Sequence, residues 1–502
     1  MQKIVIKQAF EQDWIRMFTH LANLFFEQSK IIDEDEEDVI SVAFTLDKNA
    51  DNLLIGKALL TWKGVEYASE FSELEENEDE KIKTRQLKRI YSHILLEALE
   101  QATGMQQSWG ILTGIRPMKL YHKYRQQGHS TKEAQQLLMD RHRISSEKSE
   151  LLAKIADVQL RSVPDLHDLK NEVSIYIGIP FCPTKCAYCT FPAYAIHRKN
   201  GRVESFLDGL HEEIREMGKW LTERNMAITT IYFGGGTPTS IEAEEMDALY
   251  ETMYASFPNM ENVREITVEA GRPDTITPAK IDVLKKWGID RISVNPQSYT
   301  DETLKAIGRH HSVQETVDKF WLSRNMGMKN INMDLIIGLP NEGIEEFQHS
   351  LDETEKMQPE SLTVHTLSFK RASEMTRNKD KYKVANRQTV EQMMKLGEQW
   401  NAANGYEPYY LYRQKNILGN LENVGYAKPK EESIYNIIIM EEVQTIIGVG
   451  CGASSKFIEP TTGKITQFYN PKDPAAYILT FEDAIEKKLA HLDAIFPEAV
   501  KK

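Results

Sequence analysis

The sequence predicts an α/β protein built on a partial (β/α)6 barrel, and three observations lead to this fold class. Six short apolar runs rich in β-branched residues begin at residue 173, and segments with helical spacing follow them. This alternation is typical of consecutive βα units in a parallel sheet. Three of the four cysteines lie within eight residues directly after the first run, and polar or glycine-rich groups follow the others. Because the reacting groups of βα barrels lie at the carboxyl ends of the strands, we expect one functional site at that edge.

The chain of 502 residues is long enough for several domains, and its pattern divides it into three. We expect an N-terminal α/β domain of unknown role over residues 1–165, the barrel over 166–370, and a C-terminal α+β region on the substrate side over 371–502.

The N-terminal domain has a mixed pattern of helices and strands. Two acidic runs, 33–38 and 73–80, are expected to be solvated loops. The glycine-punctuated stretch 109–117 is expected to form a core strand and turn. Regular elements are expected as a helix over 13–28, strands over 39–46 and 53–62, and helices over 81–102 and 131–161.

The barrel region has recognisable helix starts as well as strands. Thr277 followed by Pro278 supplies an N-cap and a first-turn proline, and Ser312 begins a helix that runs to residue 326. A further helix is expected over 388–404, beyond the barrel. The six strands are predicted at residues 173–180, 230–234, 265–270, 291–297, 331–339 and 361–368.

The composition excludes several classes of protein. Hydrophobic residues make up 41% and charged residues 27%, and no uninterrupted apolar stretch approaches the roughly 18 residues of a membrane span. A formal net charge of -14 argues against binding to nucleic acid or to a membrane surface. Four cysteines are too few for a disulfide framework. We therefore expect a cytoplasmic protein that binds neither nucleic acid nor membrane.

The cysteine motif Cys182-x3-Cys186-x2-Cys189 predicts an iron-sulfur centre. Three thiolates can hold three irons of a 4Fe-4S cluster and leave the fourth iron open for a reactive ligand. A structural zinc site is the alternative, but such sites usually have four protein ligands. His197, the nearest further candidate, lacks a matching spacing.

The run Tyr176-x-x-Ile-Pro-Phe-Cys182, together with the cysteine spacing, resembles the radical S-adenosylmethionine (SAM) enzymes and, within them, the oxygen-independent coproporphyrinogen III oxidase family. The resemblance implies a radical SAM barrel and a 4Fe-4S cluster whose open iron chelates SAM. One electron from the cluster cleaves SAM to a 5'-deoxyadenosyl radical. The implied activity is that of a radical SAM oxidoreductase of heme biosynthesis, which decarboxylates two propionates of coproporphyrinogen III oxidatively to give protoporphyrinogen IX.

A glycine motif ends the second predicted strand, at Tyr232-Phe-Gly-Gly-Gly-Thr237. Glycines let the backbone approach a ligand where any Cβ would obstruct it. A tight βα turn would explain the triplet equally well in isolation. By the resemblance, Gly235, Gly236 and Thr237 are expected to contact the cofactor.

Polar residues at the other strand ends match the pattern of the same family. A carboxylate suits ribose hydroxyls, and a guanidinium suits a carboxylate. Each residue taken singly also fits a hydrogen-bonded core position. Family members accommodate two SAM molecules, so we expect the matched residues to serve either one. They are Tyr176, Glu269, Gln297, Arg309 and Asp334, with Tyr188, Ser368 and Ser454 at aligned positions.

The implied tetrapyrrole substrate carries four carboxylates, so an acidic protein must concentrate cations locally. We expect Lys370, Arg371, Arg377 and Arg413 to hold these carboxylates, and a solvated basic loop is the alternative. The implied reaction also needs a one-electron reductant such as flavodoxin or ferredoxin.

The sequence identifies no catalytic side chain beyond these groups. His310, His311 and His365 fit packed or hydrogen-bonded histidines as well as acids or ligands. Cys451 lies in a glycine-rich turn and fits a small buried hydrophobic residue.

One position of the cysteine motif departs from the well-characterised oxidases. They carry Cys-x-Cys where this chain has Cys189-Thr-Phe191, and phenylalanine is typical of the branch that includes heme chaperones. The region around Asn436 lacks the Tyr-Trp pair of that branch. Because Phe191 fits that branch and the Asn436 region does not, two alternatives to the oxidase stay open. They are a heme-binding chaperone of the same superfamily and a radical SAM enzyme that acts on another substrate.

Overall fold

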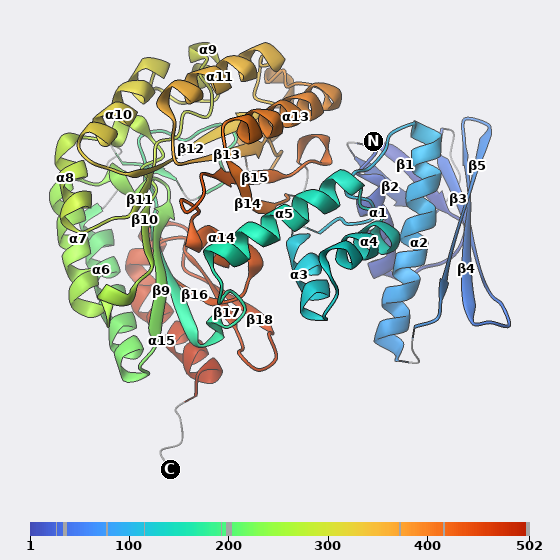
Figure 1. Ribbon diagram of the computed structural model, residues 1–502, viewed down its shortest axis with the longest axis horizontal. Coiled ribbons are helices and arrows are strands. Elements are labelled where there is room, and N and C mark those ends of the chain that lie inside the picture. Colours follow the sequence, from blue (N-terminus) through green and yellow to red (C-terminus); the bar gives the residue numbers. More distant parts are fainter. Residues whose placement is uncertain are drawn as a thin grey trace. The chain divides into compact units, whose positions relative to one another are not determined.

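The chain forms two compact units in a computed structural model, Met1–Lys154 and Ile155–Lys502 (Figure 1). No helix in the described residues is long and apolar enough to cross a bilayer. The structure describes residues 1–26, 28–33, 38–76, 79–114, 116–191, 193–196, 203–370, 373–414 and 417–497.

The first unit is a five-stranded sheet in the order β2-β1-β3-β4-β5 with helices beside it. Helices α1 and α2 cover one face, where Phe18, Leu60 and Ile94 lie in a shared hydrophobic core. The strands are β1 (Gln2–Ile6), β2 (Ser29–Ile32), β3 (Ile40–Lys48), β4 (Leu53–Trp62) and β5 (Val65–Leu74). The helices are α1 (Gln12–Ala22), α2 (Glu80–Thr103), α3 (Met118–Gln126) and α4 (Thr131–His142).

Four expectations for this unit were wrong in whole or in part. The helix expected over 13–28 ends at Ala22, and turns follow it. The acidic run 73–80 is a loop only in part, because it begins in β5 and ends in α2, and Arg89 donates hydrogen bonds of 2.7 Å to both Glu73 and Glu76. Residues 77–78 of this run, and 34–37 of the other acidic run, lie outside the described residues. The stretch around Trp109 forms turns rather than a strand, although the indole is fully buried as expected of a core residue. The helix expected over 131–161 is two helices, because Arg143 adopts a left-handed conformation with φ of 55° and ends α4 before α5 (Ser146–Ser162).

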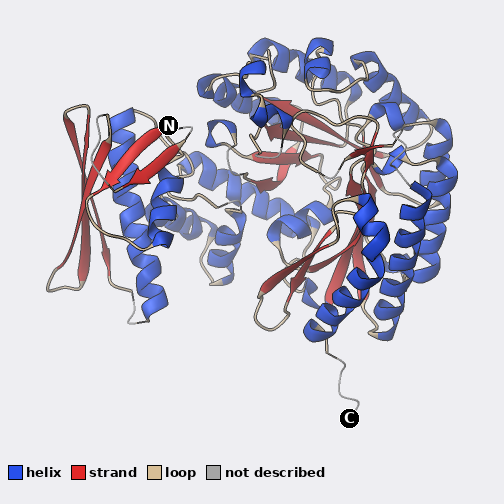
Figure 2. Ribbon diagram, turned by 180° about the vertical axis from the view of Figure 1, so that it is seen from behind, coloured by secondary structure: helices blue, strands red, loops and turns tan. Residues whose placement is uncertain are grey.

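The second unit contains the six expected barrel strands. They are all parallel and pair in the order expected from the chain, with helices packed around the outside (Figure 2). The strands are β6 (Glu172–Ile179), β9 (Ala227–Gly235), β10 (Glu265–Val268), β11 (Arg291–Ser293), β12 (Asn330–Ile337) and β13 (Ser361–Thr366). The helices between them are α6 (Val203–Glu223), α7 (Ala243–Ser256), α8 (Pro278–Lys286), α9 (Asp301–Ala306), α10 (Val313–Asn325) and α11 (Ile344–Met357). Thr277 and Ser312 cap α8 and α10 as expected.

The C-terminal segment is built into the same sheet. Strand β15 pairs antiparallel with β13 at one end, and β16 pairs parallel with β6 at the other, so that 11 strands of the described chain form one sheet. The remaining elements are β7 (Phe181–Cys182), β8 (Tyr194–Ala195), α12 (Glu374–Arg377), α13 (Arg387–Ala403), β14 (Glu407–Tyr412), β15 (Asn423–Ala427), α14 (Ile434–Glu441), β16 (Thr445–Gly450), β17 (Ser454–Ile458), β18 (Ile465–Tyr469) and α15 (Pro474–Ile495).

The boundary between the units lies within α5, upstream of the expected division at residue 165. Val158, Val163 and Leu166 explain this position, because they pack in a hydrophobic cluster with Tyr409 and Ile437 of the second unit. The division expected at residue 370 does not coincide with a compact unit, since the strands that follow it complete the barrel sheet.

A fully buried ion pair ties α15 to α6. The Lys488 ammonium donates hydrogen bonds to the Glu213 carboxylate and to the Gly448 carbonyl. Glu213 also accepts from the Gly450 amide at 2.7 Å and from the Tyr477 hydroxyl at 2.6 Å. A buried charge is tolerated only when it is paired and hydrogen-bonded, and these four contacts satisfy that condition.

We expect Lys488→Met to lower the free energy of unfolding by about 3–5 kcal/mol, because it leaves a buried carboxylate without its cation. Urea denaturation followed by tryptophan fluorescence measures this change. Lys487→Met is the matched control, since Lys487 pairs with Asp483 on the surface and both side chains are 60% exposed. The control should change the stability by less than about 1 kcal/mol. Equal effects of the two substitutions would contradict the structural importance of the buried pair.

Candidate functional site

A cavity of about 610 Å³ lies in the second unit at the carboxyl ends of the barrel strands. All fourteen residues that the sequence singles out as cofactor or metal contacts line it. These are Tyr176, Cys182, Cys186, Tyr188, Cys189, Gly235, Gly236, Thr237, Glu269, Gln297, Arg309, Asp334, Ser368 and Ser454. Their assignment to particular ligands stays a prediction.

The cysteine loop begins where β6 ends, and it is held against the end of β9. The Gly236 amide donates to the Ile179 carbonyl and the Thr237 amide to the Phe181 carbonyl, both at 2.7 Å. A Cβ on Gly236 would lie 2.4 Å from the Phe181 oxygen, and Gly235 has a φ of +108°. The two glycines are therefore required by this backbone contact. Approach of a ligand, the reason expected from the sequence, is not needed to explain them.

The three thiols lie along the cavity wall. The Cys182 sulfur is buried and lies 3.3 Å from the Thr237 hydroxyl, and Cys186 and Cys189 are partly exposed. Burial raises the pKa of Cys182 to about 11. Among the described residues, no three His, Cys, Asp or Glu side chains converge on a single ion. The three thiols on one cavity wall fit a 4Fe-4S cluster, in which each thiolate binds a different iron.

Glu269, at the end of β10, stands beside a stack of tyrosines. The Tyr232 hydroxyl donates to Glu269. The Tyr232 ring stacks on Tyr176 at 6.1 Å and on Tyr435 at 4.3 Å between ring centroids. Removal from water raises the pKa of Glu269 to about 7, against the opposing effect of the Tyr232 hydrogen bond. This carboxyl can therefore change its charge near neutral pH.

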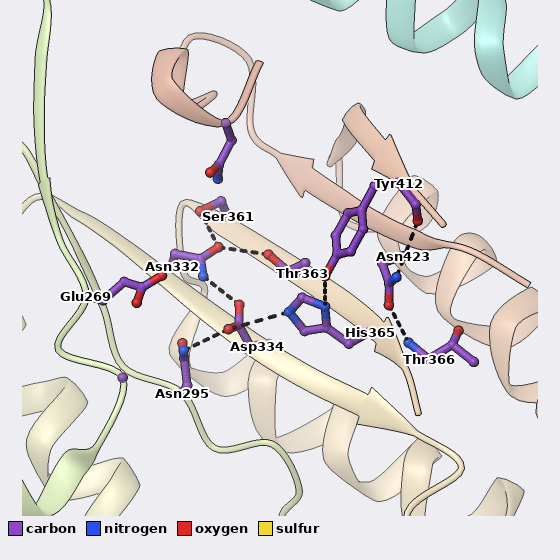
Figure 3. Close-up of polar contacts among 12 residues, drawn as sticks. Glu269, Asn295, Asn332, Asp334, Ser361, Thr363, His365, Thr366, Tyr412 and Asn423 are labelled. Atoms are coloured by element: carbon purple, nitrogen blue, oxygen red, sulfur yellow. Dashed lines mark hydrogen bonds and ion pairs between the residues drawn. The ribbon is translucent and has the colours of Figure 1, made fainter. Parts of the chain in front are cut away.

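Asp334 is the centre of a polar network on the next strands (Figure 3). It accepts from the Asn295 amide at 2.7 Å and from the Asn332 amide at 2.8 Å. The His365 Nε2 atom lies 3.6 Å from its carboxylate, and the Tyr412 hydroxyl lies 3.3 Å from His365 Nδ1. Burial raises the pKa of Asp334, but the contacts with His365 and Asn332 outweigh it and hold the pKa below its usual value. Asp334 is thus a fixed anion facing the cavity.

Several residues that line the cavity have a buried polar atom without a hydrogen-bond partner among the described residues. These atoms include Asn295 Oδ1, Gln297 Oε1 and Arg309 Nε. Gln297 also has a φ of 67°, a left-handed conformation that costs a non-glycine residue energy and concentrates at functional sites. Buried polar groups are normally paired, so these atoms fit a polar ligand such as SAM.

The far wall of the cavity comes from α14, which contributes Tyr435, Asn436, Ile439 and Met440. Glu265, the first residue of β10, holds the start of this helix. Its carboxylate accepts from the Ser433 hydroxyl and the Ile434 amide, both at 2.9 Å. A carboxylate at a helix N-terminus also compensates the helix dipole.

The sequence reasoning missed Tyr232, Asn295, Asn332, Tyr412 and Tyr435 as cavity residues. Asn332 had a detectable signal, because it lies two residues before Asp334 in β12 and a strand repeats its faces every two residues. Asn295 had none, since it follows the end of β11 at Ser293. Tyr412 and Tyr435 had no such signal, because only the folding of the chain brings these two residues to the cavity.

The expected basic and histidine residues divide into two groups. Lys370 and His365 line the cavity. Arg377 is exposed and Arg413 is buried against Asn420, and neither lines it. The histidines His310 and His311 also lie away from it, and burial lowers the pKa of His311 to about 2. Arg371 and His197 are outside the described residues, whereas Cys451 is buried and lines the cavity.

Comparison with known proteins gives a consistent result. Residues 176–354 match the radical SAM superfamily. The oxygen-independent coproporphyrinogen-III oxidase-like protein HemZ of Bacillus subtilis is 59% identical over 489 residues, which cover 97% of each chain. The heme chaperone HemW of the same species is 33% identical over 39% of this chain and 50% of its own. The structure of coproporphyrinogen III oxidase (HemN) from Escherichia coli matches with a TM-score of 0.51 at 20% identity, over 64% of this chain and 72% of that one.

The chain is therefore a radical SAM protein, and a 4Fe-4S cluster and SAM are its cofactors. With its near full-length likeness to HemZ, it belongs to the oxygen-independent coproporphyrinogen III oxidase family and acts in heme metabolism. The expected fold, family and cofactors are confirmed.

Glu269 should make SAM binding depend on pH. The ionised carboxylate accepts hydrogen bonds from hydroxyls and attracts the sulfonium cation, and with a pKa of about 7 it is mostly ionised at pH 8 and mostly protonated at pH 6. We expect SAM affinity, measured by calorimetry on the reconstituted protein, to rise about tenfold from pH 6 to pH 8.

Glu269→Gln should weaken SAM binding and remove this rise. Glu342→Gln is the matched control, because burial also raises the pKa of Glu342 to about 7 but this residue does not line the cavity. Loss of the rise in the control, or its persistence in Glu269→Gln, would contradict the role of Glu269.

Proposed function

We propose that the protein converts coproporphyrinogen III to protoporphyrinogen IX by oxidative decarboxylation of two propionate side chains, using a one-electron reductant such as flavodoxin or ferredoxin. The observation that carries this proposal is the single cavity that combines three thiols, partnerless polar atoms and tyrosine walls. The name of its 59% identical relative supports the substrate.

A 4Fe-4S cluster held by Cys182, Cys186 and Cys189, with SAM beside it in the cavity, would supply the 5'-deoxyadenosyl radical that removes a hydrogen atom from the β-carbon of a propionate. The propionate side chain would then release CO2 and pass one electron to an external acceptor, which leaves a vinyl group. The chain's own residues bind and orient the reactants. Glu269 and the fixed anion Asp334 accept hydrogen bonds, while the stacked rings of Tyr176, Tyr232 and Tyr435 offer flat apolar surface that excludes water.

Lys370 is proposed to hold a substrate carboxylate. It is the one lysine among the described cavity residues. The two described arginines of the cavity wall already have partners. Arg272 donates hydrogen bonds of 2.9 and 3.0 Å to the two oxygens of the Asp274 carboxylate. Arg309 donates to the backbone carbonyls of Gly271 and Asn295. The Lys370 ammonium also lies 5.7 Å from the centre of the Phe191 ring, which keeps it at the cavity wall.

A heme chaperone is the second candidate function. The partial likeness to HemW and the phenylalanine at position 191 favour it. The Phe191 side chain is 56% exposed and lines the cavity, so it is placed to contact a flat tetrapyrrole.

One anaerobic experiment separates the two functions. Reconstituted protein, dithionite, SAM and coproporphyrinogen III should yield protoporphyrinogen IX and 5'-deoxyadenosine, measured by mass spectrometry. Stoichiometric heme binding without any decarboxylation would instead support the chaperone and contradict the proposed enzyme.

Lys370→Glu should raise the KM for coproporphyrinogen III about tenfold or more, since it replaces attraction of a carboxylate by repulsion. The affinity for SAM should change little. Arg377→Glu is the matched control, because it makes the same change of charge outside the cavity. With dithionite as the reductant, its KM for coproporphyrinogen III should be unchanged. An unchanged KM in Lys370→Glu would contradict the assignment of this residue to the substrate.

A further inference from the structure

The segment 370–383 is basic although the chain as a whole is acidic. It carries six basic and two acidic residues, within a protein of formal net charge -14. Lys370 is directed to the cavity, but the other charges have no role in the proposed reaction. Their place in the fold is therefore informative.

The described part of this segment packs directly on the cysteine loop. The Met375 amide, in α12, donates to the Ala187 carbonyl at 3.0 Å. Met375, Tyr382 and Val384 share a hydrophobic cluster with Ala187 and Tyr188. Ala187 and Tyr188 lie between the second and third cysteines of the motif, so the segment covers the loop that holds the cluster.

The charged side chains between these apolar anchors are exposed. Arg377, Lys381 and Lys383 are exposed on the segment, and Lys185 is exposed on the cysteine loop itself. None of the four lines the cavity. Glu374 reduces the charge only slightly, because its 3.6 Å contact with Lys381 joins two side chains that are 53% and 68% exposed.

We propose that Lys185, Arg377, Lys381 and Lys383 form a docking surface for an acidic one-electron carrier protein, and we call them the basic surface. The proposal rests on the radical SAM function, since the carrier loses one electron and the cluster gains it. The overall negative charge of the chain repels an acidic carrier elsewhere, and a local basic surface steers it to the cluster. One basic segment thus serves two purposes. Lys370 holds a substrate carboxylate inside the cavity, and the exposed cations of the same segment bind the reductant outside it.

The test compares the reconstituted wild-type protein with the triple variant Arg377→Glu, Lys381→Glu, Lys383→Glu. Flavodoxin hydroquinone is the protein reductant and dithionite is the small one. We expect the rate of cluster bleaching by flavodoxin at low salt to fall at least tenfold in the variant. Its rate with dithionite, a small anion, should fall far less than its rate with flavodoxin, and added salt should slow the wild-type reaction with flavodoxin toward that of the variant.

A binding measurement gives a second readout. Flavodoxin should bind the wild-type chain at low salt at least tenfold more tightly than the variant, and carbodiimide should cross-link flavodoxin carboxylates to Lys381 or Lys383. The matched control reverses three exposed lysines elsewhere in the unit, Lys356, Lys464 and Lys487, and should behave as the wild type.

The proposal would be overturned if the triple variant kept the wild-type rates and affinity. It would also be overturned if the control variant showed the same fall in the rate of reduction by flavodoxin. Loss of reduction by dithionite would also contradict it, because residues of an outer surface should not disturb the cluster. Rapid reduction of the wild type by flavodoxin without decarboxylation would instead reject the proposed substrate and leave the docking surface supported.

Discussion

Two backbone hydrogen bonds fix the geometry on which the site depends. They join the carbonyls of Ile179, the last residue of the first barrel strand, and of Phe181 to the amides of Gly236 and Thr237 at the end of the second. Only glycine fits at position 236, because a Cβ would overlap the Phe181 carbonyl. The contact places Cys182 at the mouth of the barrel, and the strands from β9 to β13 then bring their polar ends around it.

The parts of the fold that depend on local pattern could be predicted from the sequence. The six barrel strands were found within a few residues, because each is a short apolar run followed by a helix. The end of strand β5 was not, since Glu73 belongs to an acidic run that resembles a loop, whereas its carboxylate in fact pairs with Arg89. The site was found through its motifs, whereas Tyr435 reaches the cavity because Glu265, far away in the sequence, holds the start of α14.

Charge is distributed unevenly around the cluster site, and the distribution has a physical logic. Carboxyl groups with opposite tendencies share the cavity: Asp334 is held ionised by its partners, whereas Glu269 has its pKa raised toward neutrality. Cations are few inside the cavity and gather outside on the segment that covers the cysteine loop. This separation of charges is what the two proposals use, since they assign an anionic substrate to the cavity and an acidic partner to the basic surface.

The pairing of β6 with β16 has a consequence for synthesis on the ribosome. Val173 of β6 meets Thr445 of β16, so one edge of the strand that leads to the cysteines stays open until roughly 270 further residues have been made. At typical translation rates this interval is roughly 15–50 s. An open edge strand invites pairing with other chains. Newly made protein is therefore most exposed to aggregation before β16 emerges and pairs with β6.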